Sequence, residues 1–314
     1  MDDPGDRKIH AESIPLAGGL AVFTALLIPV IFASLLVWWQ SGGPHFDETL
    51  LRPTTETRGE IPRSVLSLQS AVLLRHGMDV RAVRLGGILL GALGILVVGI
   101  LDDKHELRPR TKFAGQFLIA LLVAACGVRI TLFVHNPVFH FAITILWLVT
   151  VMNAFNFMDN MNGLCAGLGA IGAGYFALIA ARDGQYLVAV IAFLAFGALL
   201  GFLPHNFPRA RAFLGDAGSH LVGFLLAVLA ILPHFYSAKH PRPLAVLIPL
   251  LVLAVPLGDM AYVVILRWRM GQPFYQGDTN HLSHRLARRG LSKTKAVFLI
   301  WLIAVLLGGL ACFC

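Results

Sequence analysis

The residues in this sequence best suited to chemistry are acids at the ends of long apolar stretches. Asp102 and Asp103 close one stretch, and Asp216 lies in the small-residue segment Phe213-Leu-Gly-Asp-Ala-Gly-Ser219. Adjacent carboxylates at the negative end of a helix dipole need a cation nearby, either Mg²⁺ or a basic side chain. Asp216 is suited to hold a metal that bridges phosphates. The simpler alternatives are a solvated helix end for the pair and an N-cap for Asp216.

Carboxamides are concentrated in the segment 153–162, which reads Asn-Ala-Phe-Asn-Phe-Met-Asp-Asn-Met-Asn. If a helix continues through it, Asn153, Asn156 and Asn160 share one stripe, with Asp159 beside it. Buried amides can recognise a base or a sugar through paired hydrogen bonds. Capping of a membrane helix is the alternative, but four Asn and one Asp exceed what a cap needs. We therefore expect a recognition surface here.

Imidazole and guanidinium groups gather in the segment 278–289. His281, His284, Arg285 and Arg288 fall at i, i+3, i+4 and i+7, on one face of an amphipathic helix. Because Arg285, next to His284, would repel a metal ion, a diphosphate-binding surface fits the pattern better. A basic helix lying against anionic lipid is the alternative.

The elements that must position these groups are predicted to be membrane helices. Of the 314 residues, 57% are hydrophobic and 13% are charged, which excludes an ordinary soluble domain. The apolar stretches are about as long as a bilayer-spanning helix requires, and no alternating barrel pattern is present. We predict an all-α polytopic membrane bundle, a single domain over residues 1–314, with about nine transmembrane helices. The stretches are 14–40, 83–101, 113–134, 138–155, 163–181, 185–204, 217–235, 243–266 and 296–313.

Basic residues predict the orientation of this bundle. A cytoplasmic N-terminus places 15 Lys and Arg inside and 10 outside, which accounts for the net charge of +8 without nucleic acid as a partner. The segment 41–82 then becomes a long extracytoplasmic loop, and 267–295 a cytoplasmic loop that carries the histidine and arginine helix. Every polar cluster described above falls on the cytoplasmic face, so we expect the active site there.

One carboxylate does not fit this scheme. Asp259 lies inside the stretch 243–266, where a carboxylate is costly and usually paired, and Arg267 or Arg269 is its expected partner. Such a residue also suits a secondary transporter, which places charges near the bilayer midplane and commonly has internal repeats. Here the other carboxylates gather at one face and no repeat is visible, which favours an enzyme.

In their order along the chain, these segments resemble the polyprenyl-phosphate N-acetylhexosamine-1-phosphate transferases of glycosyltransferase family 4. The resemblance covers essentially the whole chain. The segments 101–116, with Asp102, Asp103 and Lys112, and 153–159 are similar to the family's aspartate pair and its Asn/Asp motif. Phe213-Leu-Gly-Asp216 is similar to its metal-binding loop, and His281-Leu-Ser-His-Arg285 to its histidine loop. Arg7-Lys-Ile-His10 looks like its first cytoplasmic segment and favours the branch that uses UDP-GlcNAc.

The resemblance implies transfer of a sugar 1-phosphate, GlcNAc-1-phosphate, from a UDP-sugar to undecaprenyl or another polyprenyl phosphate, with release of UMP. That step initiates cell-envelope polysaccharide synthesis at the bacterial cytoplasmic (inner) membrane. It implies Mg²⁺, with Mn²⁺ as an alternative ion, held by Asp216 and Asp103. A homodimer is left open, as are the phospho-MurNAc-pentapeptide transferase of peptidoglycan synthesis and a non-catalytic homologue.

The resemblance also carries roles to individual residues. Asp102 would orient or deprotonate the lipid phosphate, Lys112 would attract it, and Phe213 would stack on uracil. Catalytic roles fall on Asp102, Asp103, Asp216, His281 and His284. Substrate-binding roles fall on Lys112, Asn153, Asn156, Asp159, Phe213 and Arg285.

Three residues depart from the family pattern. Asn162 stands where the family usually has Asp, Asn160 where it often has Gly, and Ser283 where it commonly has a third His. Family members also usually carry a span before Arg7, and often one after 296–313. These departures leave the precise sugar open.

Overall fold

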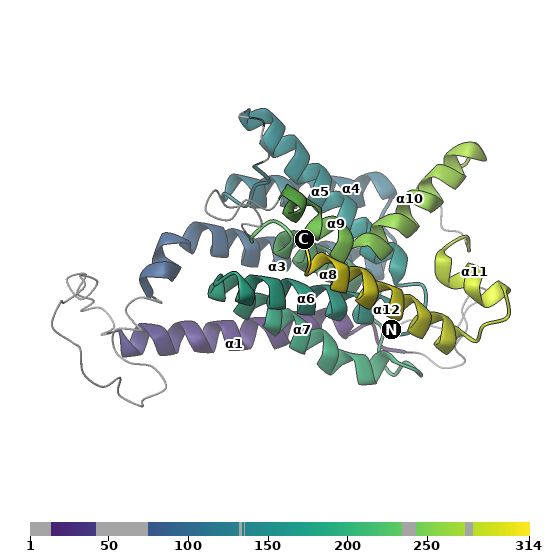
Figure 1. Cartoon of the computed structure of the whole chain (residues 1–314), viewed down its shortest axis with the longest axis horizontal. Coiled ribbons are helices and arrows are strands. Elements are labelled where there is room, and N and C mark those ends of the chain that lie inside the picture. Colours follow the sequence, from purple (N-terminus) through teal and green to yellow (C-terminus); the bar gives the residue numbers. More distant parts are fainter. Residues whose placement is uncertain (1–13, 42–74, 132–133, 135, 234–242, 274–278) are drawn as a thin grey trace.

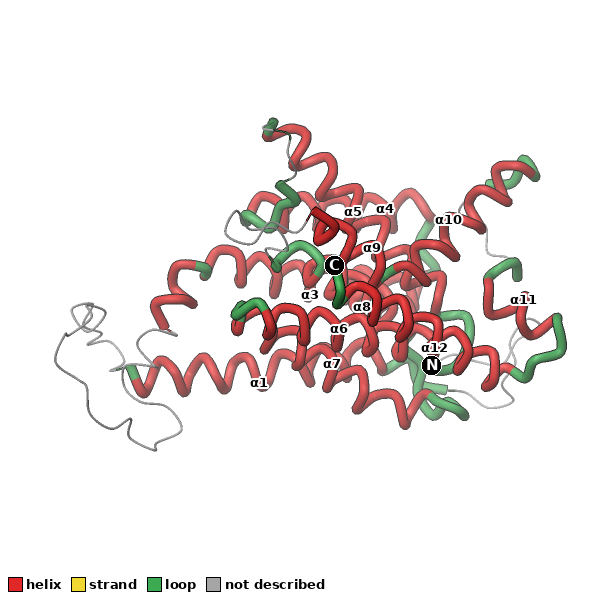
Figure 2. Tube along the Cα trace, in the orientation of Figure 1, coloured by secondary structure: helices red, strands yellow, loops and turns green. Residues whose placement is uncertain are grey.

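The computed structural model describes residues 14–41, 75–131, 134, 136–233, 243–273 and 279–314. The predictions for Arg7 to His10, for most of the loop 41–82 and for the start of the segment 278–289 lie outside these residues. Within them every regular element is a helix (Figures 1 and 2). The prediction of an all-α architecture is therefore confirmed.

The helices follow the apolar stretches closely, because each stretch satisfies its backbone polar groups internally only when it is helical. Their bounds are α1 (Gly18–Gln40), α3 (Ala82–His105), α4 (Pro109–Ala125), α5 (Pro137–Met158), α6 (Leu164–Arg182), α7 (Tyr186–Asn206), α8 (Gly215–Leu229), η3 (Pro243–Leu247), α9 (Ile248–Val252), α10 (Ala254–Arg269), α11 (Leu282–Arg288) and α12 (Lys293–Ala311).

Six of these helices are long and apolar enough to cross a bilayer, which makes the chain a multi-pass membrane protein: α1, α3, α5, α6, α7 and α12. Two of the predicted spans form shorter helices, since α4 has 17 residues and α8 has 15. A third, over 243–266, is bent. The count of nine transmembrane helices therefore stays a prediction.

Helix α8 lies at the centre of the bundle (Figure 1) and is buried from Ala217 to Leu229. Its neighbours approach closely because glycine stands at each contact, on α3 in one case and on α8 in the other. A Cβ on Gly99 of α3 would lie 2.3 Å from the Cα of Ala217, and one on Gly223 would lie 2.6 Å from the Cα of Met152 in α5. This packing fixes α8 against α3 and α5, and with it the residues at the start of α8.

The predicted span 243–266 is not one straight helix. The segments 244–252 and 254–269 meet at an angle of 73°, with Leu253 between them. Pro256 explains the break, because it has no N–H to donate to the carbonyl of Val252 and so cannot continue the helix. The bend directs α10 away from the axis of the bundle, towards the end where α11 lies (Figures 1 and 2).

Candidate active site

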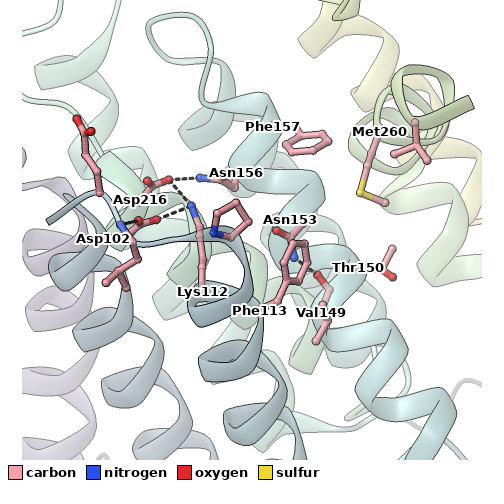
Figure 3. Close-up of a pocket in the computed structure, with 14 residues that line it drawn as sticks. Asp102, Lys112, Phe113, Val149, Thr150, Asn153, Asn156, Phe157, Asp216 and Met260 are labelled. Carbon is pink, nitrogen blue, oxygen red and sulfur yellow. Dashed lines mark hydrogen bonds and ion pairs between the residues drawn. The ribbon is translucent and has the colours of Figure 1, made fainter. Parts of the chain in front are cut away.

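Lys112 lies between two of the predicted carboxylates (Figure 3). Its Nζ is 2.6 Å from Oδ2 of Asp102 and 3.2 Å from Oδ1 of Asp216. The three residues come from α3, α4 and α8, more than a hundred positions apart at the extremes. The cation that the sequence required near Asp102 is thus a lysine in this structure. A lysine that bridges two acids at the edge of a cavity can also receive the phosphate of a substrate.

Asp103 holds the start of α8. Its Oδ1 accepts the backbone N–H of Asp216 at 2.7 Å, and its Oδ2 accepts that of Ala217 at 3.1 Å. These are N–H groups that lack partners within the helix, and a negative charge is favourable at this end of the helix dipole. The contact requires glycine at position 215, because φ is +67° there and a Cβ would lie 2.6 Å from Oδ2 of Asp103.

The two amides of α5 make separate contacts. Asn156 Nδ2 donates to Oδ1 of Asp216 and, at 3.0 Å, to Oγ of Ser219. Asn153 Nδ2 donates to Oε1 of Gln116 at 2.7 Å and to the carbonyl of Val149 at 2.8 Å. Asn156 therefore orients the carboxylate of Asp216, whereas Asn153 links α5 to α4.

The end of α5 corrects one part of the sequence prediction. The helix stops at Met158, and Asp159 is its C-cap. Asn160 is therefore not on the stripe of Asn153 and Asn156. Burial, and after it the negative charges of Asp216 and Asp103, raises the pKa of Asp159 to about 8. The carboxyl of Asp159 is therefore close enough to Asp216 and Asp103 to be affected by their negative charges.

A cavity of about 430 Å³ adjoins these residues (Figure 3). One side is polar, with Lys112 and the carboxylates at its edge, and the other side is formed by apolar side chains of α4, α5 and α10. The polar lining includes Asp102, Lys112, Asn153, Asn156 and Asp216. The apolar lining includes Phe113, Val149, Phe157, Met260 and Val264. Such a cavity suits a molecule with an anionic head and a hydrocarbon tail.

His281 is held by a different acid, Asp259. Asp259 Oδ2 lies 2.6 Å from Nδ1 of His281, and its Oδ1 accepts the backbone N–H of Leu282 at 2.6 Å. The expected pairing of Asp259 with Arg267 or Arg269 is therefore replaced by His281. Arg267 is buried instead and lies over the ring of Phe157, 5.2 Å from its centroid. Asp259 thus fixes both the ring of His281 and the first turn of α11.

Helix α11 packs against the end of α5 and against α10. The rings of Phe157 and His281 meet edge to face with centroids 5.5 Å apart, and Arg285 lies 4.2 Å from the centroid of Tyr262. Burial lowers the pKa of His284, and the neighbouring groups His281, Arg288 and Lys293 lower it further. His284 is therefore neutral near pH 7 and can donate or accept a hydrogen bond.

Known proteins are similar in sequence to this chain. The model of the family described as glycosyl transferase family 4 matches residues 85–234. The decaprenyl-phosphate N-acetylglucosaminephosphotransferase of Mycobacterium tuberculosis (strain ATCC 25618 / H37Rv) is 32% identical over 327 residues, 95% of this chain and 72% of that protein. This chain belongs to glycosyl transferase family 4.

Two further relatives in glycosyl transferase family 4 are similar over nearly the whole chain. The probable undecaprenyl-phosphate N-acetylglucosaminyl 1-phosphate transferase of Bacillus subtilis (strain 168) is 29% identical over 96% of this chain and 74% of its own length. The undecaprenyl-phosphate alpha-N-acetylglucosaminyl 1-phosphate transferase of Escherichia coli (strain K12) is 27% identical over 99% of this chain and 75% of its own length. The family resemblance read from the motifs is thereby confirmed.

The structure brings five of the predicted site residues of this family member to one cavity: Asp102, Lys112, Asn153, Asn156 and Asp216. The others lie outside its lining: Asp103, Asp159, Phe213, His281, His284 and Arg285. The backbone of Phe213 pairs with the chain at the start of α1, since its N–H donates to the carbonyl of Pro15 and its carbonyl accepts from the N–H of Gly18. Stacking of its ring on uracil stays a prediction.

The three departures from the family pattern have contacts of their own. Ser283 Oγ donates to Oδ1 of Asn160 at 2.6 Å, so two of them contact each other. Asn162 Nδ2 donates to the carbonyl of Pro208 at 3.2 Å. An Asp at position 162 could not make that bond when ionised, because a carboxylate has no donor.

Two positioning residues were missed at the sequence level. Asp259 was not connected with His281, and Ser219 was not connected with Asn156. No periodicity links Asp259 with a residue 22 positions further along, across the end of a helix. The cost of a carboxylate inside an apolar stretch was the one available signal, and it indicated a partner without identifying it.

Proposed function

We propose that this protein transfers GlcNAc-1-phosphate from UDP-GlcNAc to a polyprenyl phosphate and releases UMP. The observation that carries the proposal is the position of Lys112, between Asp102 and Asp216, at the polar edge of a cavity with apolar walls. Relatives named for decaprenyl-phosphate and undecaprenyl-phosphate support a lipid acceptor, and their names support GlcNAc as the sugar. The muramyl-pentapeptide alternative has no such support.

The cavity is proposed as the site of the acceptor. Lys112 would bind its phosphate, because an ammonium group neutralises a phosphate as a point charge. The isoprenoid units next to the phosphate would lie against Phe113, Met260 and Val264, which are apolar residues of α4 and α10. The bend between α9 and α10 places these α10 residues opposite α5.

The residues at the polar edge fit Mg²⁺, and Mn²⁺ is the alternative ion. Asp216 borders the cavity with a third of its side chain exposed, and carboxylate oxygens are the ligands of a hard cation. No three acidic, histidine or cysteine side chains in the described part of the chain form a complete metal cluster. Mg²⁺ usually keeps water and substrate phosphate oxygens as ligands, so one or two carboxylates suffice.

We assign the metal to Asp216, and we assign to Asp103 the task of fixing Asp216 through the start of α8. A bound Mg²⁺ would neutralise the diphosphate and make UMP a better leaving group. Orientation of the substrates depends on the side chains of the protein. Asp102, paired with Lys112 at 2.6 Å, would orient the lipid phosphate for attack. Phosphoryl transfer depends mainly on such positioning and on charge neutralisation.

The reaction balances without an added base. An oxygen of the acceptor phosphate forms a bond to the β-phosphorus of the UDP-sugar, and the bond from that phosphorus to the bridging oxygen breaks. UMP leaves with the electron pair. The proposed donor site is formed by Asn156 and Asp159 at the end of α5 and by His281, His284 and Arg285 at α11. The imidazoles and the guanidinium group would bind diphosphate oxygens.

The test is transfer of label in a defined membrane. The purified protein in nanodiscs is incubated with polyprenyl phosphate, UDP-GlcNAc labelled in the sugar, and Mg²⁺, and label is measured in the organic phase beside released UMP. Asp216→Asn should abolish transfer. Asp183→Asn, at an exposed acid that caps the far end of α6, is the matched control and should remain active. Full activity of Asp216→Asn would refute the metal assignment.

Two further measurements test the remaining parts of the proposal. UDP-MurNAc-pentapeptide offered in place of UDP-GlcNAc tests the peptidoglycan alternative, and labelled lipid from that donor alone would replace our choice of sugar. Sealed inverted vesicles of the bacterial inner membrane test the orientation. A cytoplasmic active site predicts that UDP-GlcNAc added outside such vesicles is used without permeabilisation.

A further inference from the structure

Helix α11 is too short to hold its own position. It has seven residues, and isolated helices of that length are not stable in water. Its place in the fold must therefore come from contacts with other elements. One is the acid Asp259 of α10, which binds the ring of His281 and the N–H of Leu282.

The second contact connects α11 with the end of α5. Ser283 is fully buried, and its hydroxyl donates to Oδ1 of Asn160 at 2.6 Å across 123 positions of sequence. The orientation of the Asn160 amide is fixed by its other end, because Nδ2 donates to the carbonyl of Phe157 at 2.6 Å. The amide oxygen is thereby left facing Ser283.

Asn160 belongs to a loop that is fixed from other directions as well. Asn162 donates to the carbonyl of Pro208, and the N–H of Gly163 donates to Oδ1 of the buried Asn206 at 2.8 Å. Asp159, next to Asn160, lies in the field of Asp216 and Asp103. The loop 159–163 is thus held in place near Asp216 and Asp103, and the hydrogen bond of Ser283 connects α11 with this loop.

We propose that Asn160 and Ser283 are positioning residues that hold His284 and Arg285 of α11 at a set distance from Asp159 and Asp216. The pair forms a latch, a hydrogen-bonded link between the two parts of the donor site, so that His284 and Arg285 would meet the diphosphate while Asp216 would hold its metal. This inference rests on the proposed function. It assigns the pair to recognition of the nucleotide sugar and not of the lipid.

The test is a double-mutant cycle made of Ser283→Ala, Asn160→Ala and the double variant. Each single change should raise the KM for UDP-GlcNAc roughly 2- to 12-fold, the range that corresponds to one net hydrogen bond. The KM for polyprenyl phosphate should stay unchanged. Because the two residues act through one bond, the KM of the double variant for UDP-GlcNAc should not exceed that of the more impaired single variant. Ser292→Ala is the matched control, since that serine caps only its own helix, α12.

A second measurement does not need turnover. Amide hydrogen exchange of 281–289 in the substrate-free protein should be faster in both single variants and equally fast in the double variant, while Ser292→Ala leaves it unchanged. The latch would be refuted if the two single changes raised the KM for UDP-GlcNAc additively, or if they raised the KM values for both substrates equally. It would also be refuted if hydrogen exchange in the single variants were as slow as in the wild type. If the wild type fails to use UDP-GlcNAc, the proposed function fails, and the exchange cycle still decides whether the latch exists.

Discussion

Replacement of Asp103 tests whether this residue caps helix α8 or binds a metal ion. Both of its carboxylate oxygens accept backbone N–H groups at the start of α8, at 2.7 and 3.1 Å. Asp103→Ala removes both acceptors. Asp103→Asn keeps one acceptor oxygen, but turns an NH₂ group towards the other N–H. The two variants should therefore lose stability in order, with Asn between the wild type and Ala.

The magnitude follows from the two bonds. A hydrogen bond to a charged group contributes about 1.5–3 kcal/mol, and loss of an exposed cap costs about 0.5–2 kcal/mol. Asp103 is only partly exposed, so we expect a cost of about 2–4 kcal/mol for Asp103→Ala and about 1–2 kcal/mol for Asp103→Asn. Activity should fall in both variants, because Asp216 loses its fixed position.

The assay is reversible unfolding of the metal-free protein in mixed micelles of increasing SDS content, with EDTA present. The order wild type, Asn, Ala in the free energy of unfolding supports the cap. A metal ligand predicts the reverse pattern: unchanged or increased stability without metal, and a higher Mg²⁺ concentration for half-maximal activity. Equal stability of Asp103→Ala and the wild type in EDTA would refute the cap.

Four further outcomes are expected. Lys112→Met should raise the KM for polyprenyl phosphate roughly 10- to 100-fold, the loss of one charged hydrogen bond, as measured by initial rates at saturating UDP-GlcNAc. Gly215→Ala should destabilise the fold by about 1–3 kcal/mol in the same SDS titration, because its φ of +67° is strained for alanine and its Cβ meets Asp103. The folded-state pKa of Asp159, about 8, exceeds its unfolded value of about 3.9, so the folded state binds the extra proton between these values. Metal-free stability should therefore fall as pH rises from about 4 to about 8, and Asp159→Asn should flatten that part of the unfolding profile. Removal of divalent ions with EDTA should stop transfer, and added Mg²⁺ should restore it; activity that survives in EDTA would contradict the metal proposal.

The helices were predictable because a run of about 20 apolar residues in a bilayer has one way to satisfy its backbone. The bend before α10 was missed even though Pro256 was visible, since a proline inside an apolar stretch can also be tolerated in a membrane helix. The shortness of α8 was not predictable from hydropathy. The side chains of α8 from Ala217 to Leu229 are buried among other helices, and burial against protein favours the same apolar residues as contact with lipid.

The site was predictable where motifs carry it and not where tertiary packing creates it. Asp102, Asn156 and Asp216 were identified from type and position, Lys112 was identified from the family resemblance, and the four residues meet in the structure. The role of Asp103 as a cap depends on how α3 packs across α8. The spacing of residues in the sequence does not predict how two helices cross. The pairing of Asn160 with Ser283 likewise depends on where α5 ends, which the sequence alone places only within a few residues.

The burial of α8 from Ala217 to Leu229 has a consequence for how this enzyme can change. Asp216 stands at the start of this buried helix, so a substitution further along α8 must be accommodated by several neighbours at once. Of the residues of α11, only Ser283 is buried, so most of its positions have fewer neighbours to satisfy. Sequence change should therefore be accommodated more readily on α11 than along the buried part of α8.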